Sequence, residues 1–331
     1  MASPLSVLVA AEVTEGKLSP TTRELLGCAR GLAGKLGGEV GCALLGSGVA
    51  GLAAQLIAHG ADRVVVADAP GLKDYLSDSY TGVMEAVVKQ TDPQIVLLGH
   101  TSQGRDLGPR LAFRLGAGLA TDCVELDIDG ASKRLLATRP VYGGNARATF
   151  STETRPQMAT VRSKAMSPLP ADPSRKGETV ALSPLPPTAS RAALTGRAKE
   201  EVKGVKLEDA SVVVSGGRGV GGVDGFKQLE ELARTLKGAV GATRAACDNG
   251  WWPASAQVGL TGKIVAPDLY IAVALSGSSQ HMAGCSGSKT IVAINKDPEA
   301  NIFKEAQYGA VGDYRQLLPA FARRVKELLE K

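Results

Sequence analysis

The strongest constraint on the fold is a set of three short apolar runs between residues 210 and 313, each of which ends in a polar turn. These runs and their turns cover residues 210–219, 269–277 and 290–297. β-Branched runs that end in Gly, Ser, Asn or Asp are typical of parallel strands that reach the carboxyl edge of an open sheet. Ligands of such sheets bind at that edge, so the pattern indicates a nucleotide cofactor laid across one sheet.

The first half of the chain alternates between strand and helix patterns. Strands are expected at residues 6–10, 40–45, 63–67 and 94–99, with helices at about 20–36, 49–59 and 75–90. The helix start at Ser19 and Pro20 is typical, because a hydroxyl caps the first turn and proline is tolerated there. Such alternation predicts a parallel sheet with helices on both faces. Residues 138–150 and 153–161 are expected to form an antiparallel pair beside that sheet.

Proline-rich segments at 167–173 and 183–188 separate the two halves, because they suit neither a helix nor a strand. We therefore expect an N-terminal α/β domain over residues 1–165 and a proline-rich linker with a short strand over 166–206. A second α/β domain is expected over 207–331, with a C-terminal helix over about 314–330 that Pro319 bends or restarts. The predicted fold class is α/β, with two Rossmann-like parallel-sheet domains.

Composition excludes several classes of protein. No apolar run reaches the ~18 residues of a membrane span, and the five cysteines include no Cys-x-x-Cys pair. The three histidines are scattered, which disfavours a metal site. Aromatic residues make up 4% of the chain, so base stacking and nucleic-acid binding are disfavoured. No signal or transit segment precedes the first strand, so a cytoplasmic location in a bacterium or archaeon is expected rather than the mitochondrial matrix.

The glycine-rich segment 215–225 lies between a predicted strand and a predicted helix. Glycines let backbone N–H groups approach an anion, and a helix N-terminus adds partial positive charge. Such a turn alone is equally compatible with a tight strand–helix connection. Arg218 favours a ligand site, because it places a cation at the mouth of the turn. The lysine of P-loop NTPases is missing, which disfavours NTP hydrolysis.

Further candidate groups are hydroxyls, amides and a guanidinium. Thr243, Arg244, Gln257 and Thr261 suit hydrogen bonding to a heteroaromatic ring better than acid–base chemistry. No nucleophile–base pair stands out, which leaves the chemistry to a cofactor.

The segment from Ser276 to His281 places a histidine at the predicted sheet edge. A lone histidine is more often a satisfied core or surface residue, but its place after a Gly-Ser turn favours a ligand role. Asn295 and Asp313 end strands and could bind a sugar or an adenine edge, although each alone is more often a turn former.

Together these segments resemble the electron transfer flavoprotein alpha subunit family. The matching motifs, in the family's order, are VVSGGRG at 213–219, GATR at 241–244, QVGLTGKIVAPDLY at 257–270, LSGSSQH at 275–281 and IVAINKDPEA at 291–300. In the first half, segments 99–107, 119–123 and 139–145 match as well. Five motifs in sequence are far more specific than one glycine turn.

The resemblance implies an alpha/beta heterodimer in which the C-terminal domain of the alpha subunit holds FAD and the first domain contacts the beta subunit. The flavin accepts electrons from flavin dehydrogenases, such as the acyl-CoA dehydrogenases of fatty acid beta-oxidation. It passes them to a membrane quinone oxidoreductase. Such a chain is an electron-transfer protein without a self-contained substrate reaction.

Carried over by position, the resemblance places Arg218 and Arg244 beside the isoalloxazine, Thr261 near flavin N5 and O4, and His281 towards O2. Ser276 and its neighbours meet the pyrophosphate. The complete set of implied cofactor-binding residues is Arg218, Thr243, Arg244, Gln257, Thr261, Ser276, Gly277, Ser278, Gln280, His281, Asn295 and Asp313. The chain departs from the family pattern at Leu260, where glutamine is common, and at Thr243, where many members have serine.

Three other functions stay open, one of which is a nucleotide-binding regulatory module without redox chemistry. In an electron-bifurcating complex, a second FAD in the beta subunit takes a hydride from NADH. A stand-alone NAD(P)-dependent oxidoreductase needs an acidic ribose ligand about 20 residues beyond the glycine turn and a catalytic acid–base group. Asp248 and Asp268 lie too far along for the first requirement, and the second is missing.

Overall fold

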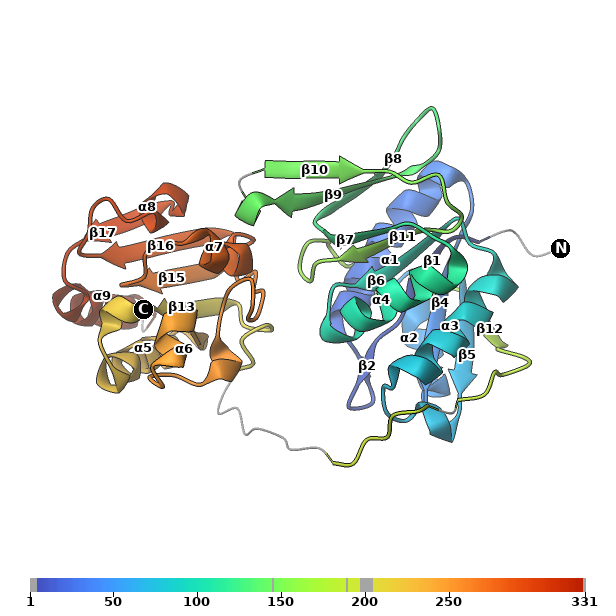
Figure 1. Ribbon diagram of the computed structural model, residues 1–331, viewed down its shortest axis with the longest axis horizontal. Coiled ribbons are helices and arrows are strands. Elements are labelled where there is room, and N and C mark those ends of the chain that lie inside the picture. Colours follow the sequence, from blue (N-terminus) through green and yellow to red (C-terminus); the bar gives the residue numbers. More distant parts are fainter. Residues whose placement is uncertain (1–4, 145, 189, 197–204, 330–331) are drawn as a thin grey trace. The chain divides into compact units, whose positions relative to one another are not determined.

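The computed structural model describes residues 5–144, 146–188, 190–196 and 205–329. The chain forms two compact units, Met1–Pro140 with Arg147–Arg197, and Val141–Ala146 with Ala198–Lys331. Figure 1 shows that each unit contains its own sheet flanked by helices. Both main sheets are parallel, which confirms the predicted α/β fold class. No helix in the described ranges is both long and apolar enough to cross a membrane.

The first unit is built on a parallel sheet of seven strands. In spatial order these are β12 (Glu178–Ala181), β5 (Arg63–Asp68), β4 (Glu39–Gly46), β1 (Leu5–Ala10), β6 (Ile95–Gly99), β11 (Gln157–Val161) and β7 (Leu119–Cys123). All six residues of β1 are buried, as expected of a central strand that is covered on both faces.

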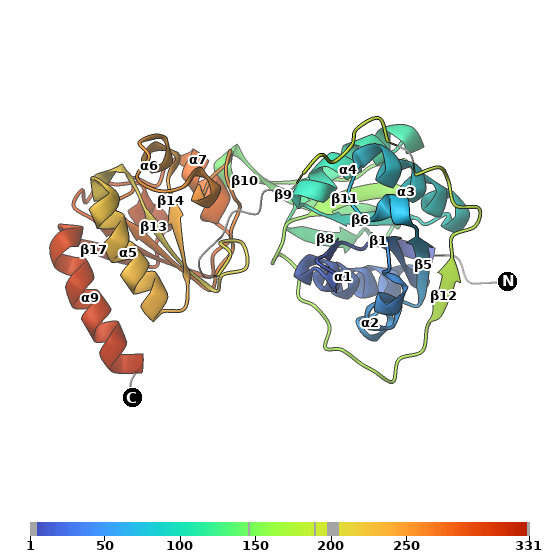
Figure 2. The ribbon, with the colours of Figure 1, turned by 90° about the horizontal axis from the view of Figure 1, so that it is seen from below.

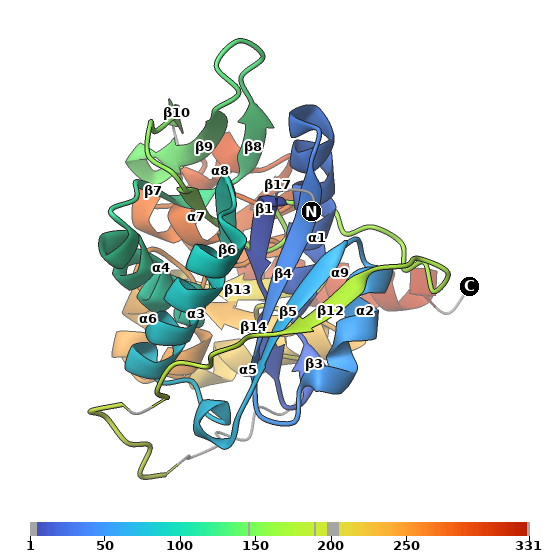
Figure 3. The same cartoon turned by 90° about the vertical axis from the view of Figure 1, so that its right-hand side faces the viewer.

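Helices cover the two faces of this sheet and create two separate cores. The first core packs against α1 (Pro20–Leu36) and α2 (Ala53–Ala58), and the second against α3 (Ser77–Thr91) and α4 (Ser102–Leu115). Figure 3 shows the two helix pairs on opposite sides of the sheet. The start of α1 is as predicted, because Ser19 Oγ accepts a hydrogen bond of 3.2 Å from the Thr22 backbone N–H.

Short elements complete the first unit. They are the antiparallel pair β2 (Val13–Thr14) and β3 (Lys17–Leu18), and the 3₁₀ turns η1 (Ala50–Leu52) and η2 (Pro70–Leu72).

The antiparallel pairing predicted for residues 138–150 and 153–161 is wrong. Strands β8 (Glu125–Ile128), β9 (Leu135–Val141) and β10 (Ala146–Phe150) form a separate three-stranded sheet, with the 3₁₀ turn η3 (Tyr142–Gly144) between the last two. Strand β11 instead inserts between β6 and β7 and runs parallel to both. Its five residues are all buried, so the apolar run suits the interior of the main sheet and not an exposed hairpin.

Part of the predicted linker is hydrogen-bonded to the first unit. Strand β12 pairs with β5 over four residues, and Thr188 O accepts a 2.7 Å hydrogen bond from Ser79 Oγ. A domain boundary placed at residue 165 would therefore separate β12 from the seven-stranded sheet, in which β12 is an edge strand.

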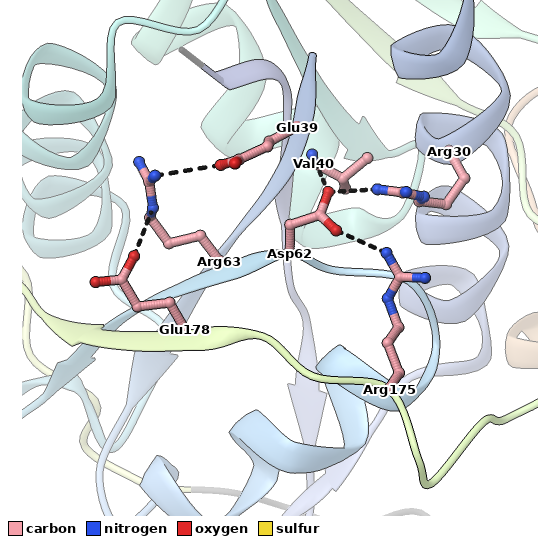
Figure 4. A network of polar contacts seen from close by, with 7 residues as sticks. All are labelled: Arg30, Glu39, Val40, Asp62, Arg63, Arg175 and Glu178. Atoms are coloured by element: carbon pink, nitrogen blue, oxygen red, sulfur yellow. Dashed lines mark hydrogen bonds and ion pairs between the residues drawn. The ribbon is translucent and has the colours of Figure 1, made fainter. Parts of the chain in front are cut away.

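The Asp62 carboxylate is the main polar anchor of this segment (Figure 4). It accepts hydrogen bonds from the Val40 backbone N–H at 2.9 Å, from Arg175 Nη2 at 2.6 Å and from Arg30. The next residue, Arg63, bonds Glu178 of β12 through Nε at 3.1 Å. One loop residue thus connects α1, β4 and the segment that follows β11.

We predict that Asp62→Ala lowers the free energy of unfolding of the first unit by about 1–3 kcal/mol, because a partly buried N–H and two guanidinium groups lose their acceptor. Urea unfolding followed by circular dichroism measures the change, and limited proteolysis near Arg175 should accelerate. The matched control is Glu153→Ala, whose carboxylate is 79% exposed in its ion pair with Arg134. Equal effects of the two substitutions would contradict the anchoring role.

The second unit has a five-stranded parallel sheet. In spatial order its strands are β14 (Ala239–Ala242), β13 (Val212–Gly216), β15 (Leu269–Val273), β16 (Thr290–Asn295) and β17 (Tyr308–Val311). One core packs against α5 (Val223–Thr235), α6 (Arg244–Asp248) and α9 (Tyr314–Leu329), and the other against α7 (Ser279–Cys285) and α8 (Ile302–Glu305). The 3₁₀ turns are η4 (Arg218–Val220) and η5 (Ala254–Ala256).

Helix α9 lies beside α5, as Figure 2 shows. It runs as one helix through Pro319, so this proline does not restart it. Its contact residues Tyr314 and Leu318 are buried against the sheet.

Candidate cofactor site

A cleft of about 760 Å³ lies at the carboxyl edge of the second unit's sheet. Its lining comes from the turns that follow β13, β14, β15 and β16, and from the loop around Gln257. The chain runs from β13 to β14 on one side, whereas β15 lies on the other side of β13. The cleft therefore sits where the strand order reverses, the usual place for a ligand in an open parallel sheet. Its volume is within the range of small-molecule and cofactor sites.

The first glycine turn lies directly against the turn after β15. Gly217 N donates to Val273 O at 3.0 Å, and Gly219 N donates to Ala274 O at 3.1 Å. A Cβ on Gly217 would lie 2.5 Å from Ala274 O, so no larger residue fits without moving the backbone. The glycines at this point are thus required for the two turns to meet and form one wall of the cleft.

Eleven of the twelve predicted site residues line this cleft. They are Arg218, Thr243, Arg244, Gln257, Thr261, Ser276, Gly277, Ser278, Gln280, His281 and Asn295. Asp313 is not among the lining residues. It precedes α9, and its carboxylate accepts a 2.9 Å hydrogen bond from the Arg315 backbone N–H.

Three charged residues that were not predicted to belong to the site also line the cleft, namely Asp248, Lys296 and Asp297. Lys296 and Asp297 directly follow Asn295 at the end of β16, so their position after a predicted strand could have identified them as candidate site residues. Asp248 lies one helical turn after Arg244, and its carboxylate is 3.4 Å from Arg244 Nε. Both side chains of this pair are largely exposed, so the pair leaves the guanidinium accessible to a ligand.

Hydroxyl and amide groups supply neutral hydrogen bonds in the cleft. Gln257 Nε2 donates to Thr261 Oγ1 at 2.9 Å, and Asn295 Nδ2 donates to Leu275 O at 2.8 Å, which fixes the turn after β15. Thr243 Oγ1 is enclosed and has no hydrogen-bond partner among the described residues. An enclosed hydroxyl without a partner costs free energy, and a polar ligand in the cleft would remove that cost.

The turn before α7 shapes the second wall. Gly277 has φ +72°, in the left-handed region, and a Cβ there would lie 2.4 Å from the Ile302 backbone nitrogen. Ile302 N in turn donates to Ser276 O at 3.0 Å. This close approach holds the Ser276–Ser278 turn open towards the cleft.

His281 lines the cleft but is only 5% exposed. Its Nε2 lies 2.8 Å from Tyr270 Oη, and its Nδ1 lies 3.1 Å from Val258 O. Burial lowers the pKa of His281 to about 4, and the bond to Val258 opposes that shift. The ring is therefore neutral near pH 7.

Two family models match the chain. The model described as electron transfer flavoprotein domain covers residues 7–186, and the one described as electron transfer flavoprotein FAD-binding domain covers residues 206–286. The chain belongs to the electron transfer flavoprotein alpha subunit family. The FAD-binding match includes most of the residues that line the cleft.

Curated relatives agree with this family over nearly the whole length of the chain. The alpha subunit of an electron transfer flavoprotein from Thermoanaerobacterium thermosaccharolyticum is 46% identical over 97% of this chain and 98% of its own. The corresponding subunit from Bacillus subtilis is 42% identical, again over 97% of this chain and 98% of its own. A protein named FixB from Clostridium saccharobutylicum is 44% identical over 98% of this chain and 97% of its own.

The residues present fit the flavin cofactor that this electron transfer flavoprotein family binds. The cleft offers cationic groups for a phosphate-bearing ligand, amide and hydroxyl groups for a ring edge, and the unpartnered Thr243 hydroxyl. Among the described residues, no cluster of His, Cys, Asp and Glu side chains is suited to a metal ion.

We predict that Gly277→Ala lowers the stability of the second unit by at least about 2 kcal/mol, because it adds both left-handed strain and a contact with the α8 backbone. FAD content per heterodimer, measured by absorbance after desalting, should fall in parallel. Gly287→Ala is the control, since its new Cβ would meet nothing closer than 3.4 Å. Full FAD retention and an unchanged melting temperature in Gly277→Ala would contradict this account of the turn.

Proposed function

We propose that this chain is the FAD-carrying subunit of a heterodimeric electron transfer flavoprotein. Its flavin accepts electrons from flavin dehydrogenases, such as acyl-CoA dehydrogenases, and passes them to a membrane quinone oxidoreductase. The observation that carries the proposal is the second unit's cleft, whose described lining combines Arg218 and Arg244 with many hydrogen-bonding groups and the exposed carboxylates of Asp248 and Asp297. Such a lining suits a bound redox cofactor better than catalysis by side chains.

In this proposal the arginines act by charge. Arg218 begins η4 and Arg244 begins α6, so both project from turns at the same sheet edge. Bound FAD supplies the redox chemistry, because it takes up and releases electrons singly or in pairs. Positive charge beside the isoalloxazine favours the added negative charge of reduction.

The other lining residues bind and orient the cofactor. Thr261 would contact the ring near N5 and O4, and Gln257, whose amide donates a hydrogen bond to Thr261, would line the same pocket. Ser276, Gly277 and Ser278 would hold the pyrophosphate at the turn before α7. Asn295 and Asp313 would lie towards the adenosine end. Because Asp313 is not among the residues that line the cleft, we propose that it lies at the rim of the cleft.

Leu260 gives the rim of the cleft an apolar character. Its side chain is 63% exposed, and its backbone N–H donates to Gln280 O at 2.7 Å. The backbone of this residue is therefore anchored, and its side chain presents an apolar surface at the rim.

The beta subunit is the proposed partner of the first unit. The family pairs alpha and beta subunits, and the cleft that fits the cofactor belongs to the second unit. We propose a structural and docking role for the first unit on this basis.

An anaerobic titration of the purified heterodimer tests the proposal. We expect a reduced acyl-CoA dehydrogenase to bleach one FAD per heterodimer and NADH to leave it oxidised. Bleaching by NADH with two flavins per heterodimer would instead establish the electron-bifurcating function. No flavin absorbance would contradict the electron-carrier proposal, and NAD(P) binding by the alpha chain alone would favour a stand-alone oxidoreductase.

We predict that Arg218→Gln makes reduction of the flavin less favourable by about 0.5–1 kcal/mol, because an exposed cation is partly screened by solvent. Spectroelectrochemistry gives the midpoint potential. Arg218→Lys should restore most of the change, since it keeps the charge. Arg234→Gln, an exposed arginine on the far part of α5, is the matched control and should leave the potential unchanged. An unchanged midpoint potential in Arg218→Gln would mean that the charge of Arg218 does not act on the flavin ring.

A further inference from the structure

Asp248 is an acidic residue of the cleft that has no role in the proposed function. It ends α6, the helix that Arg244 begins, and its carboxylate lies 3.4 Å from Arg244 Nε. Its side chain is 65% exposed, and that of Arg244 is 70% exposed. The two opposite charges therefore lie together at the surface of the cleft, where a bound ligand can meet both.

The stability of α6 does not explain this ion pair. A cation at the first residue of a helix and an anion at the last oppose the helix dipole, so this order of charges is the less favourable one at a spacing of four residues. The end of α6 is held by another group, since Asn249 Nδ2 donates to Ala245 O at 2.7 Å. The position of the pair on the cleft is therefore its more informative property.

The charges of the cleft do not all favour an anionic ligand. The described lining has three cationic side chains and two carboxylates, so its formal charge is +1 with His281 neutral. The carboxylate of Asp297 stabilises its own turn, because it accepts a 3.0 Å hydrogen bond from the Glu299 backbone N–H. Asp248 is thus the carboxylate of the lining that directly offsets an arginine. The cations are Arg218, Arg244 and Lys296, and the carboxylates are Asp248 and Asp297.

A carboxylate beside a guanidinium changes the field that acts on a ligand. Two opposite unit charges 3.4 Å apart act at a distance as a dipole, whose field is weaker than that of the cation alone. The carboxylate meets the Nε edge of Arg244, so the two terminal amino groups of the guanidinium remain available to a ligand. Asp248 therefore reduces the positive potential of the arginine without blocking these hydrogen-bond donors.

We propose that Asp248 is a counter-charge to Arg244 that lowers the reduction potential of the bound flavin. The inference rests on the proposed function in one respect, that FAD occupies this cleft. Reduction adds negative charge to the flavin, and Asp248 opposes that charge while Arg244 favours it. The carboxylate thus helps the flavin to release electrons to an acceptor, whereas the arginine helps it to take them up.

Asp248→Asn tests the counter-charge, because it keeps the size of the side chain and removes its charge. Spectroelectrochemistry of the FAD-loaded heterodimer gives the midpoint potential. We expect a more positive potential, equivalent to an increase of about two- to fivefold in the equilibrium constant for reduction. Added salt should reduce the difference, since the carboxylate is exposed. Asp248→Glu keeps the charge and should stay close to the wild-type potential.

The matched control is Asp268→Asn. Asp268 precedes β15, so it lies at the amino edge of the same sheet, and its 59% exposed side chain pairs with Lys289 Nζ at 2.7 Å. We expect the wild-type potential in this variant. A lower potential in Asp248→Asn would mean that Asp248 serves to orient Arg244, and an unchanged potential would mean that its charge does not act on the flavin. Either result would overturn the proposal.

The two proposals fail in different ways. A wild-type heterodimer without FAD would contradict the electron-carrier function and, with it, the role of Asp248. A heterodimer that contains FAD, is reduced by the dehydrogenase and keeps its potential in Asp248→Asn would contradict the role of Asp248 alone.

Discussion

The contact between the turns after β13 and β15 is the constraint on which the second unit's site depends. Two backbone hydrogen bonds join these turns, from Gly217 to Val273 and from Gly219 to Ala274, and a Cβ on either glycine would lie within 3.0 Å of Ala274 or Leu275 atoms. The same contact places Arg218 at the mouth of the cleft, because it lies between the two glycines. The close approach of the two turns and the placement of Arg218 therefore have one common cause, the absence of a side chain at two positions.

Much of the candidate site could be predicted because its signals are local. Arg218, Thr243, Ser276 and Asn295 each follow an apolar run by one to four residues, and parallel strands bring such positions to one edge. Strand partners could not be predicted in the same way. The residues Gln157–Val161 suit a strand in either direction. The strand is parallel because it inserts between β6 and β7, and the sequence of the strand itself does not show that.

The segment after β11 illustrates the same limit. Its prolines exclude regular structure over several residues, which correctly places them outside a helix, but they give no information on what the segment contacts. The attachment depends on Asp62 and Arg63, more than a hundred residues earlier in the chain. Likewise, the sequence indicates His281 at a sheet edge but not its bond to Tyr270, because that bond depends on side-chain direction within the core.

The ionisable groups of the cleft share a property that suits electron transfer. Guanidinium groups stay protonated at all ordinary pH values, and the pKa of His281, lowered to about 4 by burial, keeps that ring neutral near pH 7. Amides and hydroxyls do not titrate in this range. The field that these groups exert on a ligand in the cleft is therefore nearly constant over physiological pH. A site that must hold a steady affinity for electrons, and need not move protons through its own side chains, benefits from this arrangement, whereas a hydrolase or dehydrogenase site would need a group with a pKa near 7.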